Sequence, residues 1–193
     1  MITPDEVLDF WFAGNPRVRR EVWFRRQDDF DAACGAFTTA LHAARQGALD
    51  QWADTPRGTL ALIILLDQFS RNLHRGSPEA FAADSKARAL ARRAVAEGID
   101  RQLEWLERLF IYLPFEHSED LVDQEDSVRL FENLRIGLGD LAAEQAYRHR
   151  DIIRRYGRFP YRNVALGRES TSEEQAFLAR LGAELQARGL ARG

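Results

Sequence analysis

A chain of 193 residues, 45% hydrophobic and 30% charged, has room for one domain with a substantial core, and this composition excludes general disorder. The formal net charge of -3 gives no attraction to nucleic acid or anionic membranes, so neither is expected as a partner. The longest apolar run, Leu60–Leu66, is far below the roughly 20 residues of a membrane span. Cys34 has no possible disulfide partner within the chain, and the first residues lack a basic signal segment. A cytoplasmic location is therefore expected.

Helix signals begin at the first residues. Thr3–Glu6 has the pattern of a capping box, with proline at the first helical position. Apolar residues recur at helical spacing across Phe30–Leu41 and predict a second amphipathic helix. Thr55-Pro56 begins a third, which is apolar on all sides as far as Phe69. This third helix is predicted to be the buried centre of the domain.

Similar signals predict five further helices in the rest of the chain. Their expected boundaries are a start at Ser77-Pro78, an end at Pro114, N-caps at Ser118 and Asp140, and a capping box at Thr171 and Glu174. No segment shows the alternation of a strand, so residues 1–193 are predicted to form a single all-α domain. About eight helices with short links favour an antiparallel helix-hairpin array over a four-helix bundle. Residues 188–193 are expected to be a frayed tail.

Two similar segments, Leu66–Asn72 and Gly157–Asn163, are the main candidates for a binding site. Each follows a helical stretch and places an Arg-Asn pair just after an aromatic residue. Arginine keeps its charge and offers a planar fork of donors, so such a segment either ties helix ends together or binds an anion. Both readings stay open for each segment taken alone. The candidate ligand-binding residues are Asp67, Gln68, Arg71, Asn72, Arg158, Arg162 and Asn163.

The segment Pro114–Asp126 is strongly acidic and contains no lysine or arginine. Its His117 with Glu116 or Glu119 forms a candidate acid–base group. A metal site is not predicted, because His117-x-Glu119 is not a familiar ligand spacing on a helix. The favoured alternative is an ion-pair network with the arginines between residues 148 and 168. The chain has no G-x-G-x-x-G or P-loop motif, and no cofactor is expected.

Motifs along almost the whole chain resemble a bacterial domain-of-unknown-function family, the one numbered 924. The matching segments, in order, are Val7–Phe12, Leu60–Asn72, Phe81–Ala87, Leu113–Asp120, Gly157–Asn163 and Thr171–Glu174 with Phe177-Leu178. The resemblance implies an all-α fold similar to tetratricopeptide-like α-α superhelices, and it brings no assigned reaction. The family pattern commonly has proline where Ser70 stands and histidine where Tyr161 stands.

Three functions are compatible with these features. The first is a binding or scaffold module with a groove, lined by arginine, asparagine and histidine, for a small anionic ligand or a peptide. The second is an enzyme that uses His117 and neighbouring carboxylates on an anionic substrate. The third is a purely structural role for both Arg-Asn segments. Only the positions of these side chains in space can separate the three.

Overall fold

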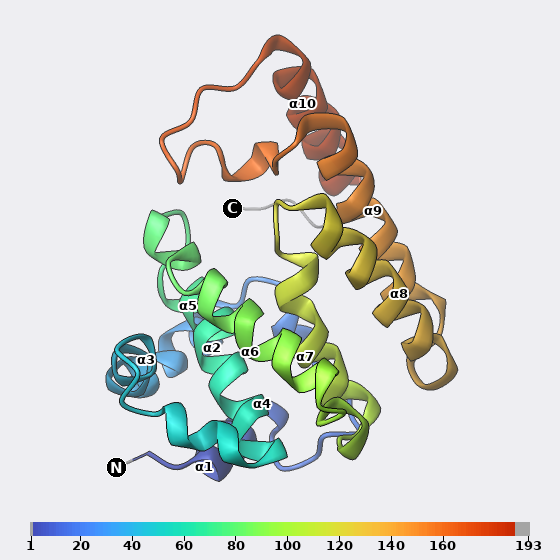
Figure 1. Ribbon diagram of the computed structural model, residues 1–193. Helices are drawn as coiled ribbons and strands as arrows, with labels where there is room; N and C mark the ends of the chain where they lie inside the picture. The colour runs from blue at the N-terminus through green and yellow to red at the C-terminus, as the bar shows by residue number, and fades with distance from the viewer. Residues whose placement is uncertain (1, 188–193) are drawn as a thin grey trace.

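The computed structural model describes residues 2–187, so the predicted tail at residues 188–193 lies outside the described part. Every regular element within residues 2–187 is helical, which confirms the all-α prediction (Figure 1). None of these helices is long and apolar enough to cross a bilayer. The α-helices are α1 (Pro4–Phe12), α2 (Asp28–Cys34), α3 (Thr38–Arg45), α4 (Pro56–Ile64), α5 (Ser70–Leu73), α6 (Asp84–Ala96), α7 (Trp105–Glu116), α8 (Leu121–Leu138), α9 (Asp140–Tyr156) and α10 (Ser172–Ala187).

Three helix starts form as their local sequence predicts. The Thr3 N–H donates to Glu6 Oε2 at 2.8 Å, and the Glu6 N–H donates back to the Thr3 hydroxyl at 3.3 Å. Thr171 and Glu174 make the same exchange at 2.8 and 3.2 Å. The Thr55 hydroxyl accepts a backbone N–H from the first turn of α4. Each cap satisfies donors that the first turn of a helix leaves unpaired.

The predicted end at Pro114 is wrong, because α7 continues through this residue to Glu116. Near the C-terminal end of a helix, proline still removes a backbone N–H and strains the preceding turn, at a cost of about 3 kcal/mol. Residues 109–116 are all buried, so packing on both sides of Pro114 holds the last turn in helical form. His117 is consequently the C-cap of α7 rather than part of a separate bend.

Several other boundaries differ from the predictions. The second predicted helix is interrupted by a 3-10 turn, Gly35–Phe37, and the fourth begins as the 3-10 turn η5 (Pro78–Phe81) before α6. The N-cap of α8 is Asp120, whose carboxylate accepts two backbone N–H groups, and not Ser118. Asp140 is the first residue of α9 and not its cap. Short polar side chains compete for these positions, so the sequence locates a helix start only to within about two residues.

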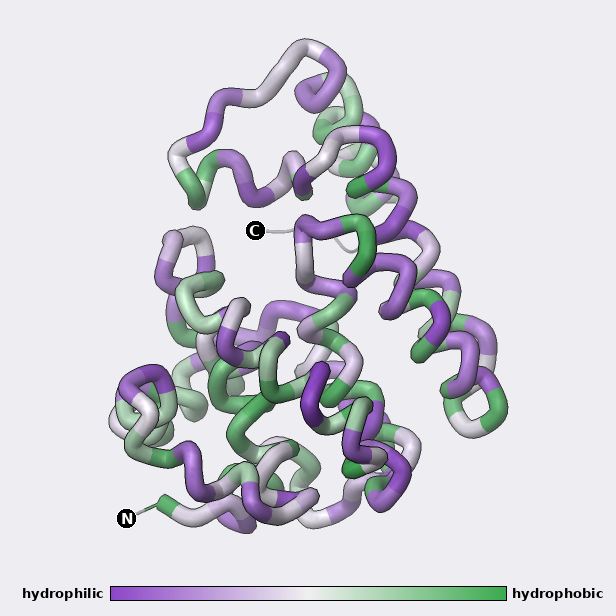
Figure 2. The backbone as a smooth tube through the Cα atoms, viewed as in Figure 1, coloured by the Kyte–Doolittle hydropathy of each residue, from purple (hydrophilic) through white to green (hydrophobic). Residues whose placement is uncertain are grey.

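The apolar helix α4 lies at the centre, as predicted, and packs against α1, α6 and α7. Figure 2 shows the chain at α4 as strongly hydrophobic. Further along the chain, α6 packs against α7, α7 against α8, and α8 against α9. Helices α8 and α9 run side by side (Figure 1). The last helix, α10, contacts the 3-10 turn η7 (Pro160–Arg162). This order brings the segment after α9 back over the ends of α6 and α7.

A π-helical turn, η4 (Leu65–Phe69), joins α4 to α5 without leaving the helical path. All five of its residues are buried, including Asp67 and Gln68. The wider π turn is rare, and it occurs frequently at functional sites. Phe69 points into the core, where its ring lies 5.0 to 5.8 Å from the rings of Phe10, Trp11 and Phe37. The turn therefore carries a core anchor and two buried polar groups within one short segment.

Candidate functional site

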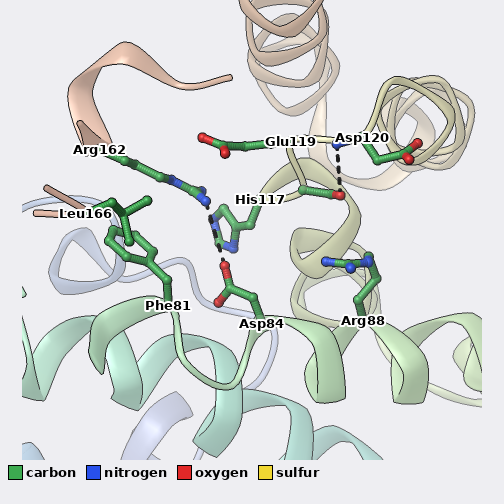
Figure 3. Close-up of a pocket in the computed structure, with 9 residues that line it drawn as sticks. Phe81, Asp84, Arg88, His117, Glu119, Asp120, Arg162 and Leu166 are labelled. Carbon is green, nitrogen blue, oxygen red and sulfur yellow. Dashed lines mark hydrogen bonds and ion pairs between the residues drawn. The ribbon is translucent and has the colours of Figure 1, made fainter. Parts of the chain in front are cut away.

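Three segments that are distant in sequence line an open pocket of about 400 Å³. One wall comes from η5 and the start of α6, the second from the turn between α7 and α8, and the third from η7 and the loop after it (Figure 3). A volume of this size suits a small molecule. The lining residues are Phe81, Asp84, Arg88, His117, Ser118, Glu119, Asp120, Arg162 and Leu166.

Asp67 lies beneath this pocket, at the base of the His117 side chain. Its side chain is 1% exposed, and its Oδ1 accepts a hydrogen bond from His117 Nδ1 at 2.8 Å. Arg71 Nη1 lies 3.0 Å from the same oxygen, and the Gln68 amide donates to Oδ2. Burial alone would raise the pKa of Asp67, but Arg71 and His117 outweigh burial and hold it well below its usual range. Asp67 is therefore an ionised carboxylate that His117, Arg71 and Gln68 all contact.

His117 presents the other side of its ring to the pocket. Burial lowers the pKa of His117, Arg71 lowers it further, and Asp67 opposes both effects. The ring is consequently neutral at physiological pH, with its proton on Nδ1 where the carboxylate accepts it. Nε2 then carries a lone pair and faces away from Asp67. An imidazole in this state accepts a proton or a hydrogen bond from a ligand.

The lowered pKa of His117 predicts a loss of stability on mild acidification. The unfolded histidine titrates near pH 6.5, above the folded one, so the unfolded chain binds more protons as the pH falls below about 6.5. The free energy of unfolding should therefore fall between pH 7.5 and 5, by at most about 1.4 kcal/mol per pH unit from this group.

The measurement is urea unfolding of the wild-type chain and of His117→Gln at several pH values. The stability difference between the two should shrink as the pH falls, because only the wild type has the group. Nitrogen-15 NMR of the histidine rings at pH 7 should also show His117 neutral, with its proton on Nδ1. An imidazolium signal for His117 at pH 7 would contradict this assignment.

Arg71 and Arg162 converge on Asp84 from different elements. Arg71 forms two hydrogen bonds with the Asp84 carboxylate, both at 2.9 Å, whereas Arg162 Nη1 lies 3.7 Å from it. The Arg162 guanidinium lies over the rings of Phe81 and Phe159, at 4.8 and 4.6 Å from their centroids. Burial lowers the pKa of Arg162, and Arg71 adds to this, but a guanidinium stays charged. Although Arg162 is only 7% exposed, its guanidinium makes no hydrogen bond with any described side chain or backbone oxygen.

Of the seven predicted binding residues only Arg162 lines the pocket, and three of the other six make structural contacts elsewhere. The Asn72 amide donates to Asp31 of α2 at 2.8 Å. Arg158 holds the Glu174 carboxylate at 2.6 and 2.8 Å. Asn163 is fully buried and donates to the Ser170 hydroxyl at 3.0 Å. The two Arg-Asn segments therefore differ, because Arg162 lines the pocket whereas Arg71 reaches it only through Asp84, and both asparagines make structural contacts.

The geometry pairs His117 with Asp67 instead of the sequence neighbours Glu116 and Glu119. Glu119 lines the pocket, but its two oxygens accept hydrogen bonds from Arg168 at 2.7 and 2.9 Å. Glu116 is buried on another side of α7, where its Oε1 lies 3.4 Å from His149. Successive residues on a helix point about 100° apart, so adjacent side chains rarely share a partner.

The predicted ion-pair network between the acidic segment and the later arginines forms in part. Glu119 pairs with Arg168, and Glu125 pairs with Arg154 at 2.5 Å. Asp123, by contrast, is buried and pairs with two arginines of α6. No group of three or more His, Cys, Asp or Glu side chains within residues 2–187 is arranged to hold a metal ion.

Sequence reasoning missed Asp84, Arg88 and Phe81 as parts of the pocket. The signal available for them was the segment Phe81–Ala87, which carries part of the family resemblance although it has no known catalytic pattern. It supplies a carboxylate between two arginines and an aromatic ring under one of them. The pairing of Asp67 with His117 had no local signal, because the two residues are far apart in the chain.

The chain is thus an all-α protein with a small, charged pocket between the ends of its helices. It belongs to the bacterial family of proteins of unknown function DUF924, whose pattern matches residues 7–182. A solved structure of a protein of unknown function from Agrobacterium tumefaciens, ATU0120, is 39% identical in sequence, with a TM-score of 0.81. That similarity covers 91% of this chain and 96% of the other. Comparison with curated proteins gives no match.

Proposed function

We propose that this protein binds a small anionic molecule in the pocket beside Arg162 and His117. The observation that carries the proposal is the state of Arg162, a nearly buried guanidinium without a hydrogen bond to any described residue. The Arg162 N–H groups without a protein acceptor reach the open pocket, where water or a ligand can accept their hydrogen bonds. The ion pair with Asp84 at 3.7 Å is too long to satisfy its fork of donors.

The surrounding rings strengthen this reading. Arg162 makes cation–π contacts with Phe81 and Phe159, which occupy none of its hydrogen-bond donors. The N–H edge is the part of the group that binds carboxylate and phosphate oxygens in pairs. The pocket holds about 400 Å³, which suits a small anion.

The test compares anion binding by the wild-type chain, Arg162→Gln and Arg162→Lys. Native mass spectrometry of freshly purified protein should first show any co-purifying small molecule. Isothermal titration with acetate, butyrate and inorganic phosphate should then show binding that Arg162→Gln weakens by about tenfold or more, since charge-assisted hydrogen bonds contribute roughly 1.5–3 kcal/mol. Arg162→Lys should retain part of the affinity, because it keeps the charge and loses the fork.

Arg155→Gln is the matched control, because Arg155 is an exposed arginine whose partner is Glu173 on α10 and which does not line the pocket. It should bind the same anions as the wild type does. Equal affinity of Arg162→Gln and the wild type for every anion would refute the proposal, as would the absence of binding by the wild type.

A second candidate function is acid–base catalysis on the bound anion. It is favoured by the 2.8 Å contact between Asp67 and His117, in which a buried carboxylate fixes one ring nitrogen and leaves the other for a substrate. This is the arrangement of a general base held by an orienting group. The NMR measurement on His117 described above tests it, because a charged ring at pH 7 has no lone pair for this role.

The proposed setting is the cytoplasm. Cys34 is fully buried, and burial raises the pKa of its thiol to about 12, so it persists in the protonated form. The proposed architecture is that of tetratricopeptide-like arrays, with α6 to α9 as successive antiparallel neighbours. In such arrays the surface formed by helix ends and inner faces commonly carries the binding site.

A further inference from the structure

Arg88 is the second arginine of the pocket, and it reaches the cavity from α6. Its Nε lies 3.1 Å from Asp123 Oδ2. Asp123 already accepts hydrogen bonds from Arg92 and from the Ser118 hydroxyl, so its charge is well satisfied without Arg88. Neither Nη atom of Arg88 has a hydrogen-bond partner among the described residues. Arg88 therefore keeps a two-pronged donor edge available, as Arg162 does.

The two arginines approach from opposite walls, with the His117 ring between them (Figure 3). Arg162 belongs to η7, and Arg88 lies one turn after the start of α6. Phe81 and Leu166 add apolar surface to the same cavity. The pocket thus combines two cationic ends with an apolar side and one neutral acceptor.

The carboxylates of the pocket leave most of these two arginine edges free, because Asp84 lies 3.7 Å from Arg162 but is held more closely by Arg71. Asp84 is held by both Nη atoms of Arg71. Glu119 is held by Arg168. The Asp120 side chain caps α8 and, in Figure 3, points away from His117. Because these acceptors are committed elsewhere, the open groups that remain in the pocket are mainly donors.

We infer that the ligand is a small dianion with an anionic group at each end, one held by Arg162 and the other by Arg88. A guanidinium edge matches one carboxylate or phosphate in bidentate geometry, so two separate edges select two anionic groups. The apolar surface of Phe81 and Leu166 suits a short hydrocarbon link between them. This inference rests on the proposed function and specifies the class of molecule that the pocket takes.

The experiment is isothermal titration of the full chain with linear dicarboxylates (succinate, glutarate and adipate) and with butyrate as the monoanion. At least one dicarboxylate should bind tenfold to a hundredfold more tightly than butyrate does. Arg88→Gln should reduce the affinity of that dicarboxylate to about the level of butyrate, and it should weaken butyrate binding much less. Arg162→Gln should weaken both ligands.

Arg92→Gln is the control, since Arg92 pairs with Asp123 from the same face of α6 but does not line the pocket. It should bind dicarboxylates as the wild type does, and each variant is compared at a temperature where its circular dichroism is that of the wild type. If Arg162→Gln does not fold, Arg162→Lys replaces it. Dicarboxylates that bind no better than butyrate, with both dependent on Arg162, would overturn the inference and leave the proposed function standing. Absence of binding by every acid, together with phosphate, would overturn both.

Discussion

Replacing Asp67 by alanine is expected to destabilise the protein by about 3–5 kcal/mol. The side chain is 1% exposed and interacts with Arg71, His117 and Gln68. Without this side chain, the Arg71 guanidinium has one carboxylate partner fewer, and the His117 Nδ1–H has no acceptor. The expected loss is the desolvation cost of these abandoned groups, which exceeds the net contribution of the intact ion pair.

Urea unfolding at pH 7 measures this effect as a change in the free energy of unfolding. Asp5→Ala is a suitable control, because Asp5 forms an exposed ion pair with Arg57 at 3.2 Å and should contribute about 0–1 kcal/mol. A loss below about 1 kcal/mol for Asp67→Ala would mean that the polar cluster relaxes or takes up water. In that case the orientation of His117 could not depend on Asp67.

Replacing Phe69 by alanine should cost a similar amount, about 3–5 kcal/mol, for an apolar reason. The ring is fully buried, and it lies within 5.8 Å of three other aromatic rings, measured between centroids. Truncation to alanine loses the transfer free energy of the ring. It also leaves a cavity among the three neighbouring rings, and the surrounding helices cannot close it.

The same unfolding measurement applies, with Phe24→Ala as the comparison. Phe24 is 45% exposed and should cost about 1 kcal/mol or less. Phe69→Ala should also weaken ligand binding only indirectly, since Phe69 does not line the pocket. Comparable losses for the two variants would show that the aromatic cluster around Phe69 is not the rigid centre that its burial indicates.

The sequence predicts helices well where a short pattern decides the structure. Thr3, Thr55 and Thr171 cap their helices as expected, because a cap depends on residues within one turn. Pro114 is different, since its cost of a few kcal/mol is outweighed by the burial of its neighbours in α7. That burial depends on other helices packing against α7, and no local pattern contains it.

The site was predictable only in its parts. Arg71, Arg162 and His117 stand out by chemistry and by motif, and the structure brings them near one another at Asp84 and Asp67. Their partners did not stand out, because the partner of His117 lies 50 residues earlier, in a π turn that no sequence rule specifies. For the same reason Glu116 and Glu119, its neighbours in sequence, seemed the natural partners.

The three walls of the pocket also differ in the time at which they leave the ribosome. Those contributed by α6 and by the end of α7 emerge well before η7 brings Arg162. A nascent chain that ends before residue 162 therefore lacks one side of the pocket and exposes the His117 ring to water. A ligand that needs both sides can bind only after η7 has been made, and its binding would hold η7 and the loop after it against α6 and α7.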